Sequence, residues 1–327
     1  MPTPPVSIAP MMEKTDRHYR YLMRQITRHT LLYTEMITTG AILHGDRDYL
    51  LGFDELEHPL SLQLGGDDPD ELYRAVRIAE EYGYDEYNLN VGCPSDRVQN
   101  ANFGACLMAR PAQVRELVGA MRSATRRPVT VKHRIGIDGR ESYEQMREFV
   151  EVVNEAEPAR FTVHARIAVL GGLSPKENRT VPPLRYEDVY RLKRELPRLQ
   201  IEINGHVGSL DEIEAHLDRV DGVMVGRAAY DHPWLFADVD ERFFGADHAD
   251  RPTRRRVVDG MVPYLDRWCA AGWPARNVLR HMLGLFAFCP GTRKYKQALS
   301  GPLPASNDGA AMLRDAVAHL RPEVLDA

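Results

Sequence analysis

The sequence predicts an α/β protein, a TIM (β/α)8 barrel followed by a small all-helical C-terminal domain. Three observations support this. Short β-rich runs alternate with helical stretches over the first 240 or so residues, and the β signal disappears after Phe244. The 327 residues also suffice for one barrel of about 250 residues and a further domain. We expect a barrel over 1–243, a linker over 244–252 and a helical domain over 253–327.

Each expected strand is a short run of aliphatic and β-branched residues, at 6–9, 31–34, 60–64, 87–91, 129–134, 161–164, 200–204 and 222–225. Amphipathic segments lie between most of them, and four begin at a proline or serine that suits a first helical turn: 69–82, 111–125, 142–155 and 209–217. A doubly wound sheet is the alternative. It usually has a glycine-rich turn after its first strand, which here reads APMMEKTD, so we favour the barrel.

Beyond FGADHADRP (244–252), helical patterns cover 254–269, 275–288, 294–299 and 310–320. From Arg251 on, 12 Lys and Arg stand against 6 Asp and Glu, a net +6, whereas the preceding residues hold 30 against 41. A basic attachment on an acidic body suits a polyanion, although a solvated helical tail is the plainer explanation. The loop 170–184 is long for a barrel, and such loops are often functional.

The cysteines do not have the spacing of a zinc site or a CxxC pair, so we expect no metal and thiols in a reducing cytoplasm: Cys93, Cys106, Cys269 and Cys289. MPTPPVSIAP lacks the charged start and apolar run of a signal peptide. No apolar stretch approaches the roughly 20 residues needed to cross a bilayer. We expect no membrane association.

Polar residues gather where the predicted strands end, which is the catalytic face of a TIM barrel: Gln63, Asn88, Asn90, Lys132, Arg134, His164, Arg166 and Asn204. Any one of them could be a structural polar group, but five adjacent strands ending this way are hard to explain by packing alone. Lys132 is one of only six lysines. A lysine there could form a Schiff base or hold negative charge on a cofactor.

The last two barrel loops predict a phosphate site. They read Asn204-Gly205-His206-Val207-Gly208 and Gly226-Arg227-Ala228. Glycines let backbone N–H groups approach a phosphate, Arg227 adds charge, and the loops after strands seven and eight are the usual TIM-barrel phosphate site. Cys93 lies in a Gly-rich loop after strand four. It could be a small buried hydrophobe or a proton donor, whereas Cys106 in the apolar run ACLM suggests a structural role.

Several motifs together resemble the tRNA-dihydrouridine synthases: IAPMM (8–12), NLNVGCPS (88–95), VKHRIGID (131–138), SPKENR (174–179) and VMVGRAAYDHPWLF (223–236). SPKENR and FGACLM (103–108) resemble the A subfamily, and the similarity runs in order over most of the chain. Two positions depart from the pattern. Met12-Glu13-Lys14 stands where Asp-Trp is expected, and His206 where a second glycine is commoner.

The resemblance implies an FMN-dependent enzyme of the cytoplasm, acting as a monomer on D-loop uridines around tRNA position 20, with NADPH as the electron donor. Hydride would pass from reduced flavin to uracil C6 and a proton from Cys93 to C5. The implied flavin contacts are Ala9, Pro10, Met11, Gln63, Lys132, His164, Asn204, Gly205, His206, Gly226 and Arg227. The implied substrate and tRNA contacts are Asn90, Arg134, Arg166, Lys176, Asn178, Arg179, Arg293, Lys294 and Lys296.

Three alternatives stay open. A flavin enzyme of free pyrimidines would not need the basic tail. A Schiff-base aldolase could use Lys132 and the phosphate loops, but it has no need of Cys93 or the tail. A non-catalytic tRNA-binding module would not need the set of Cys93, Lys132 and His164.

Overall fold

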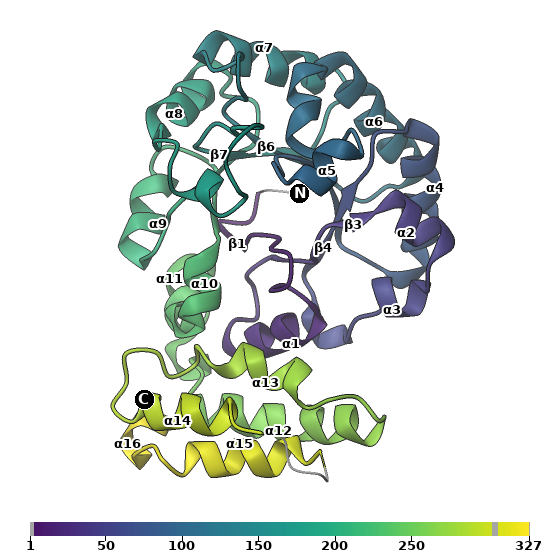
Figure 1. Cartoon of the computed structure of the whole chain (residues 1–327). Helices are drawn as coiled ribbons and strands as arrows, with labels where there is room; N and C mark the ends of the chain where they lie inside the picture. Colours follow the sequence, from purple (N-terminus) through teal and green to yellow (C-terminus); the bar gives the residue numbers. More distant parts are fainter. Residues whose placement is uncertain (1–2, 303–306, 327) are drawn as a thin grey trace. The chain divides into compact units, whose positions relative to one another are not determined.

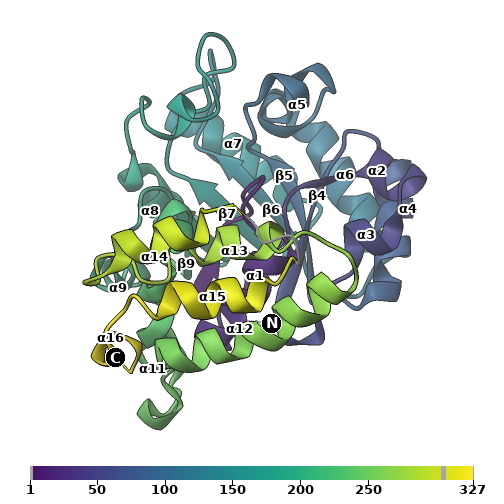
Figure 2. The same cartoon turned by 60° about the horizontal axis from the view of Figure 1, so that its bottom comes forward.

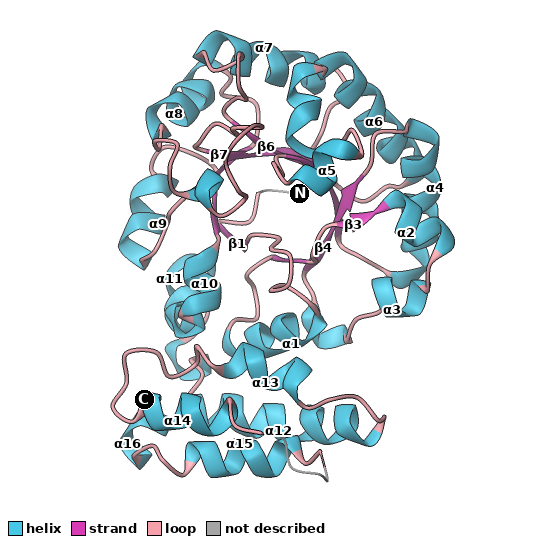
Figure 3. Ribbon diagram, in the orientation of Figure 1, coloured by secondary structure: helices cyan, strands magenta, loops and turns pink. Residues whose placement is uncertain are grey.

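The computed structural model describes residues 3–302 and 307–326. Its centre is a ring of parallel strands: β1 (Val6–Ile8), β2 (Leu32–Tyr33), β4 (Leu60–Gly65), β5 (Glu86–Val91), β6 (Val129–Arg134), β7 (Arg160–His164), β8 (Ile201–Asn204) and β9 (Gly222–Val225). Neighbours follow the order β1-β9-β8-β7-β6-β5-β4-β2, and a parallel bridge between Ser7 and Leu31 joins the two ends (Figures 1 and 3). The predicted TIM barrel is confirmed. A short additional strand, β3 (Ile37–Thr38), pairs with the end of β4.

Helices surround the strand ring (Figure 1): α2 (Thr39–His44), α3 (Arg47–Leu51), α4 (Pro69–Ala79), α5 (Asp96–Asn100), α6 (Pro111–Ala124), α7 (Tyr143–Asn154), α8 (Tyr186–Glu195) and α9 (Leu210–Leu217). Their starts follow the sequence signals. Pro69 and Pro111 occupy first-turn positions, and the hydroxyls of Ser142 and Ser209 accept hydrogen bonds from the backbone N–H groups of Gln145 and Glu212.

Side chains alternate along the strands, and in this barrel the inward set is polar. Arg160 on β7 reaches Tyr33 on β2, and Ser7 on β1 reaches Glu202 on β8. The first of these pairs crosses the ring, because several strands separate β7 from β2 in the sheet order. The residues that alternate with this inward set along the strands, such as Leu89, Val131 and Ile203, are buried and apolar. The apolar core therefore includes the outer face of the strands, and the polar groups fill the interior.

The chain forms two compact units, one of residues up to Met12 with Leu31–Gly226 and the other of Glu13–Thr30 with the residues from Arg227 on. The second unit holds α1 (Arg17–Ile26), α10 (Arg227–Asp231), α11 (Val239–Phe244), α12 (Arg254–Ala270), α13 (Arg276–Met282), α14 (Thr292–Leu299), α15 (Gly309–Val317) and α16 (Pro322–Leu325). The sequence predicts a single division over 244–252. The structure differs because α1 packs against α12 and α13, and Asp16 both caps α1 and pairs with His281 at 3.0 Å.

Within the second unit, α12, α14 and α15 lie side by side (Figure 2). The helix expected over 275–288 ends at Met282 and continues as turns. Gly284 fits there because of close packing, since a Cβ would lie 2.8 Å from Pro233 Cδ, and Phe288 has a left-handed φ of 64°. Among the described residues, no helix is long and apolar enough to cross a membrane.

Candidate active site

The strand register brings the predicted polar residues to one end of the barrel. Gln63 on β4 lies opposite Asn88 on β5, and Asn90 lies opposite Lys132 on β6. One step further along the strands, Arg134, His164 and Asn204 are successive neighbours on β6, β7 and β8. This end of the barrel is where the (β/α)8 fold places its active sites.

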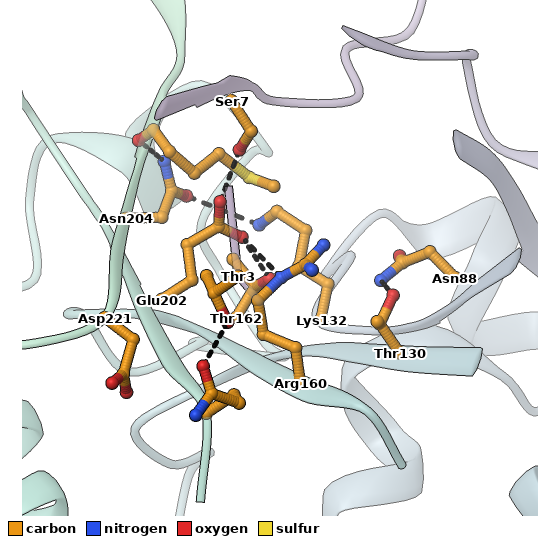
Figure 4. Close-up of polar contacts among 12 residues, drawn as sticks. Thr3, Ser7, Asn88, Thr130, Lys132, Arg160, Thr162, Glu202, Asn204 and Asp221 are labelled. Atoms are coloured by element: carbon orange, nitrogen blue, oxygen red, sulfur yellow. Dashed lines mark hydrogen bonds and ion pairs between the residues drawn. The ribbon is translucent and has the colours of Figure 1, made fainter. Parts of the chain in front are cut away.

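A buried ion cluster lies below these residues. Arg160 Nη2 donates to Glu86 Oε2 at 2.8 Å, and Arg160 Nε lies 3.5 Å from Glu202 Oε2. Hydroxyl groups supply the other hydrogen bonds to the two carboxylates (Figure 4, in part), from Ser7, Tyr33, Ser61, Thr130 and Thr162. This cluster was not predicted from the sequence. Its signal was a charged residue in the first or second position of a strand, as in EYNLNV, RFTVH and IEIN.

The backbone of Cys93 is tied to this cluster by a chain of side-chain amides. The N–H of Cys93 donates to Asn90 Oδ1 at 3.0 Å. Asn90 Nδ2 donates to Gln63 Oε1 at 2.8 Å, and Gln63 Nε2 donates to Asn88 Oδ1 at 2.7 Å. Asn90 and Gln63 thus use both ends of their amides, which fixes their orientation.

The chain continues to a carboxylate. Asn88 Nδ2 donates to Thr130 Oγ1 at 2.9 Å, and Thr130 Oγ1 donates to Glu86 Oε1 at 2.9 Å. Every donor from Cys93 to Glu86 points the same way, so each bond polarises the next. We call the groups from the Cys93 N–H to the Glu86 carboxylate the amide relay. The relay holds the start of the Cys93 loop in register with the barrel floor.

Lys132 and Asn204 form a second polar pair in the barrel. Lys132 Nζ donates to Asn204 Oδ1 at 3.3 Å, and Asn204 Nδ2 donates to Met224 O at 2.8 Å (Figure 4). Burial lowers the pKa of Lys132 to about 8, and repulsion from Arg134 adds to this effect, while Glu202 and Cys93 oppose it. The ammonium group is charged at neutral pH and becomes neutral at mildly alkaline pH.

His164 lies among cationic side chains at the same end. Burial lowers its pKa well below the ordinary value, and the charges of Arg134, Lys132, Arg166 and Arg179 lower it further. The imidazole is therefore uncharged at neutral pH. Positive charge from Lys132 and the nearby arginines gives this end of the barrel an environment that favours an anionic or electron-rich ligand.

Two arginines predicted as substrate contacts brace the loops. Arg134 donates from Nε to Gly92 O at 3.1 Å and from Nη1 to Ile167 O and Asn178 O at 3.0 and 2.9 Å. Arg166 donates to the carbonyls of Thr180 and Pro182. The bonds of Arg134 link the Cys93 loop to the long loop that follows β7, and those of Arg166 lie within that long loop, so the structure favours positioning roles for both side chains.

Asn178, also predicted as a substrate or tRNA contact, is fully buried. Its Oδ1 accepts from Val169 N at 2.8 Å, and its Nδ2 donates to Val169 O at 2.9 Å and Leu173 O at 3.1 Å. The amide is used within its own loop, which favours a role in holding that loop. Lys176 and Arg179 flank it and are exposed.

Cys93 is half-buried, and its Sγ lies 3.5 Å from Ser95 Oγ. The loop returns to it, since Ala105 N donates to Cys93 O at 2.9 Å. Cys106 is held by its own turn, with Sγ 3.1 Å from Phe103 O. Arg110 Nη2 lies 3.8 Å from Cys106 Sγ, so both thiols have a cation nearby. The relay and the loop closure distinguish the environment of Cys93 from that of Cys106.

The loops predicted to bind phosphate follow neighbouring strands, β8 and β9. Gly205 has a φ of +136°, and its carbonyl accepts from Tyr186 OH at 2.5 Å. His206 is exposed with a φ of 59°, a left-handed conformation that glycine adopts more easily. A Cβ on Gly226 would meet no atom within 4 Å, which leaves its backbone open to a ligand. Arg227 follows directly and begins α10.

The segment after β1, predicted to contact the flavin, starts inside the barrel wall. Ala9 N donates to Val225 O at 2.8 Å. Met11 packs against a cluster of Ala9, Leu31, Tyr33 and Met224. Pro10, between them, is half-buried.

The remaining predicted contacts lie on α14 in the second unit. Arg293, Lys294 and Lys296 are exposed, while Tyr295 between them is buried and donates from its hydroxyl to Met282 O at 3.0 Å. None of the three cations has an ion pair or hydrogen-bond partner among the described residues. Surface arginines of the barrel differ, for example Arg115, which pairs with Glu155 at 2.5 Å.

Comparison with known proteins agrees with this geometry. The family model for dihydrouridine synthase matches residues 7–317. The tRNA-dihydrouridine(20/20a) synthase of Synechocystis sp. is 55% identical over 313 residues, which are 96% of this chain and 93% of that protein. The enzyme of the same name from Pseudomonas putida is 52% identical over 96% of this chain and 94% of its own length. That of Vibrio parahaemolyticus is 50% identical over 98% of both chains.

The relay predicts that Thr130→Val loosens the Cys93 loop. The change removes one hydroxyl, which leaves Asn88 Nδ2 without its acceptor and takes one of four hydrogen bonds away from Glu86 Oε1, at a cost of roughly 1–3 kcal/mol of folding stability. We expect iodoacetamide to alkylate Cys93 several times faster, measured by peptide mass spectrometry.

Thr162→Val is the matched control, because it removes a hydroxyl bond to Glu202 without touching the relay. It should destabilise the protein similarly and leave the alkylation rate of Cys93 unchanged. Equal rates in the two variants would show that the relay does not hold the loop.

Proposed function

Because the chain belongs to the dihydrouridine synthase family, we propose that it is a flavin-dependent tRNA-dihydrouridine(20/20a) synthase, which reduces the C5–C6 bond of uracil in D-loop uridines. The observation that carries the proposal is the place of Cys93. It follows a strand at the catalytic end of the barrel, its backbone is held by the amide relay, and Lys132 and Arg134 lie near enough to interact with it electrostatically. A thiol held beside cationic groups is suited to deliver a proton to a bound ring.

The residues at this end fit FMN. Gly226 leaves space at its backbone, Gly205 has a left-handed conformation, and Arg227 adds positive charge, a combination suited to the phosphate. Gln63 and Lys132 would hold the ring system, together with the backbone of Ala9–Met11, His164 and Asn204. When bound, the reduced flavin supplies hydride to C6 of the uracil, and NADPH restores the reduced state.

This chain's own residues complete the reaction. Hydride addition leaves negative charge on the uracil ring, and the Cys93 thiol neutralises it by giving its proton to C5. The thiol must therefore be protonated when the base binds. We assign Asn90 to orienting the base, and the uncharged His164 can offer a hydrogen bond without adding charge. Arg134 and Arg166 keep the two loops in place. The target uridine has to leave its stack to reach the barrel.

We assign the binding of tRNA to exposed cations. Arg293, Lys294 and Lys296 on α14, and Lys176 and Arg179 on the loop after β7, are exposed cations. We assign these side chains to phosphates of the tRNA backbone. Such contacts fix the position of the tRNA on the protein and carry no sequence information. The enzyme would act as a monomer in the cytoplasm, where its substrate is.

The decisive experiment measures dihydrouridine at each position of tRNA from cells with and without this gene, alongside the visible spectrum of the purified protein. Loss of dihydrouridine at positions 20 and 20a, with a flavin spectrum, supports the proposal. A yellow protein with unchanged tRNA would point to free pyrimidines as the substrate.

We expect Cys93→Ala to lower turnover by about 10²–10⁴-fold, because the proton would have to come from water. Flavin content and tRNA affinity should stay within a factor of about two, measured by absorbance and filter binding. Cys106→Ala is the control and should keep its activity. An active Cys93→Ala enzyme would remove Cys93 from the mechanism.

Lys132 predicts a pH dependence of flavin binding. Below its pKa of about 8 the ammonium is charged and attracts an electron-rich ring, and above it the attraction is lost. The Kd of the apoprotein for FMN should therefore rise above pH 8, by up to about tenfold per pH unit. Flavin fluorescence quenching between pH 6.5 and 10 measures it.

Lys132→Met should bind FMN weakly at every pH, and Lys132→Arg should keep its affinity up to pH 10 because guanidinium stays charged. If Lys132→Met keeps the wild-type pH profile, another group is responsible for it.

The double change Arg293→Gln with Lys296→Gln should weaken tRNA binding and reduce the slope of log K against log salt by about 1–2, because two phosphate contacts are lost. Arg115→Gln with Arg122→Gln makes the same charge change at arginines already paired with Glu155 and Glu157. That control should keep the wild-type slope, and equal slopes in all three proteins would place the phosphate contacts elsewhere.

A further inference from the structure

The turn between α13 and α14 presents a phenylalanine ring to solvent. Phe288 is 90% exposed, the highest value among the exposed large hydrophobic side chains of the described residues. Phe286, two positions earlier, is fully buried and packs edge-on against Tyr295 at 4.7 Å between ring centroids. Packing within the second unit thus accounts for Phe286, whereas it covers little of the Phe288 side chain.

The backbone at this position opposes the residue type as well. Phe288 has a φ of 64°, in the left-handed region that bulky side chains rarely adopt and glycine adopts freely. An aromatic residue here is unfavourable both for the backbone conformation and for the exposed ring. Such an arrangement is typical of residues kept for a function.

The turn that carries Phe288 is firmly braced. The Thr292 hydroxyl bonds to the carbonyl of Phe286 and, at 2.7 Å, to that of Cys289. Arg254 Nε donates to Leu285 O at 3.3 Å. The turn is therefore fixed on both sides of the exposed ring, which lowers the entropy lost when a partner binds.

The surroundings of the ring indicate what the partner is. His232 meets Phe288 in a T-shaped contact at 5.0 Å, and burial lowers the pKa of His232, so the imidazole is neutral. Arg293, Lys294 and Lys296 begin five positions further along, exposed and without partners among the described residues. Proteins hold single-stranded nucleic acid by combining exposed aromatic rings, which stack on bases, with cations that neutralise the phosphates, and this turn and the start of α14 supply both.

We propose that Phe288 stacks on an unpaired base of the tRNA substrate, while the cations of α14 bind phosphates of the same segment. The inference rests on the proposed function and adds a base contact to it. Stacking uses the face of the base and not its edge, so the contact accepts any base and acts by fixing the tRNA segment.

Phe288→Gly gives a sharp test, because it removes the ring and relieves the backbone. We expect its melting temperature to rise by about 2 °C, while its Kd for tRNA rises roughly 5- to 100-fold, as loss of one stacked base predicts. The KM for tRNA should rise and kcat at saturating tRNA should stay unchanged. Phe288→Trp should keep wild-type affinity, and tRNA should quench its additional indole fluorescence.

Three outcomes separate the possibilities. A more stable Phe288→Gly protein that binds tRNA as tightly as wild type overturns the stacking contact. If that protein also loses self-association in sedimentation, the ring contacts a second copy instead of RNA. If the wild-type enzyme itself forms no dihydrouridine in tRNA, the proposed function fails, irrespective of Phe288.

Discussion

The polar interior of the barrel is the constraint on which the rest of this molecule depends. Glu86, Arg160 and Glu202 are charged groups excluded from water, and they are tolerable only as a set, because removing one partner of a buried pair typically costs about 3–5 kcal/mol. The carboxylates of Glu86 and Glu202 lie deep in the barrel, and the cations Lys132 and Arg134 lie nearer its catalytic end, so opposite charges occupy different depths. The barrel thus stabilises positive charge at its catalytic end while its outer face remains apolar.

Function follows from how that charge is distributed. The amide relay connects the Glu86 carboxylate to the Cys93 backbone through an unbroken series of hydrogen bonds. The donors and acceptors of its side chains are engaged in these bonds, which fixes the side-chain orientations. His164, placed among cations, is uncharged, and Lys132 is charged but close to losing its proton at neutral pH. The proposed proton donor and the residues that support it are therefore parts of one hydrogen-bond network. Mutations of the buried ion cluster should affect the reaction at Cys93.

Much of the fold and part of the candidate site were predictable from the sequence. The alternation of β-rich and helical stretches predicted the barrel, and the residue types at the strand ends predicted the polar site, since both are local patterns. The ion cluster was missed because a charged residue inside a strand shows neither its depth nor its partner. Arg134 and Asn178 were predicted as substrate contacts, but residue type does not reveal that a loop carbonyl already accepts the hydrogen bond. The place of α1 depends on contacts with residues far along the chain, which no local period records.

The long separation in sequence between α1 and the helices it packs against has a consequence for biosynthesis. The apolar face of α1 ends at Ile26 and is synthesised long before its partner α12, which begins only at Arg254. At about 5–20 residues per second, the nascent helix waits roughly 10 to 50 seconds for that partner. Throughout this time Tyr19, Leu22 and Met23, all buried in the finished protein, lack α12 and α13 to cover them. The second unit can be completed only after α12 and α13 have been synthesised, and until then α1 is a segment for a chaperone to shield.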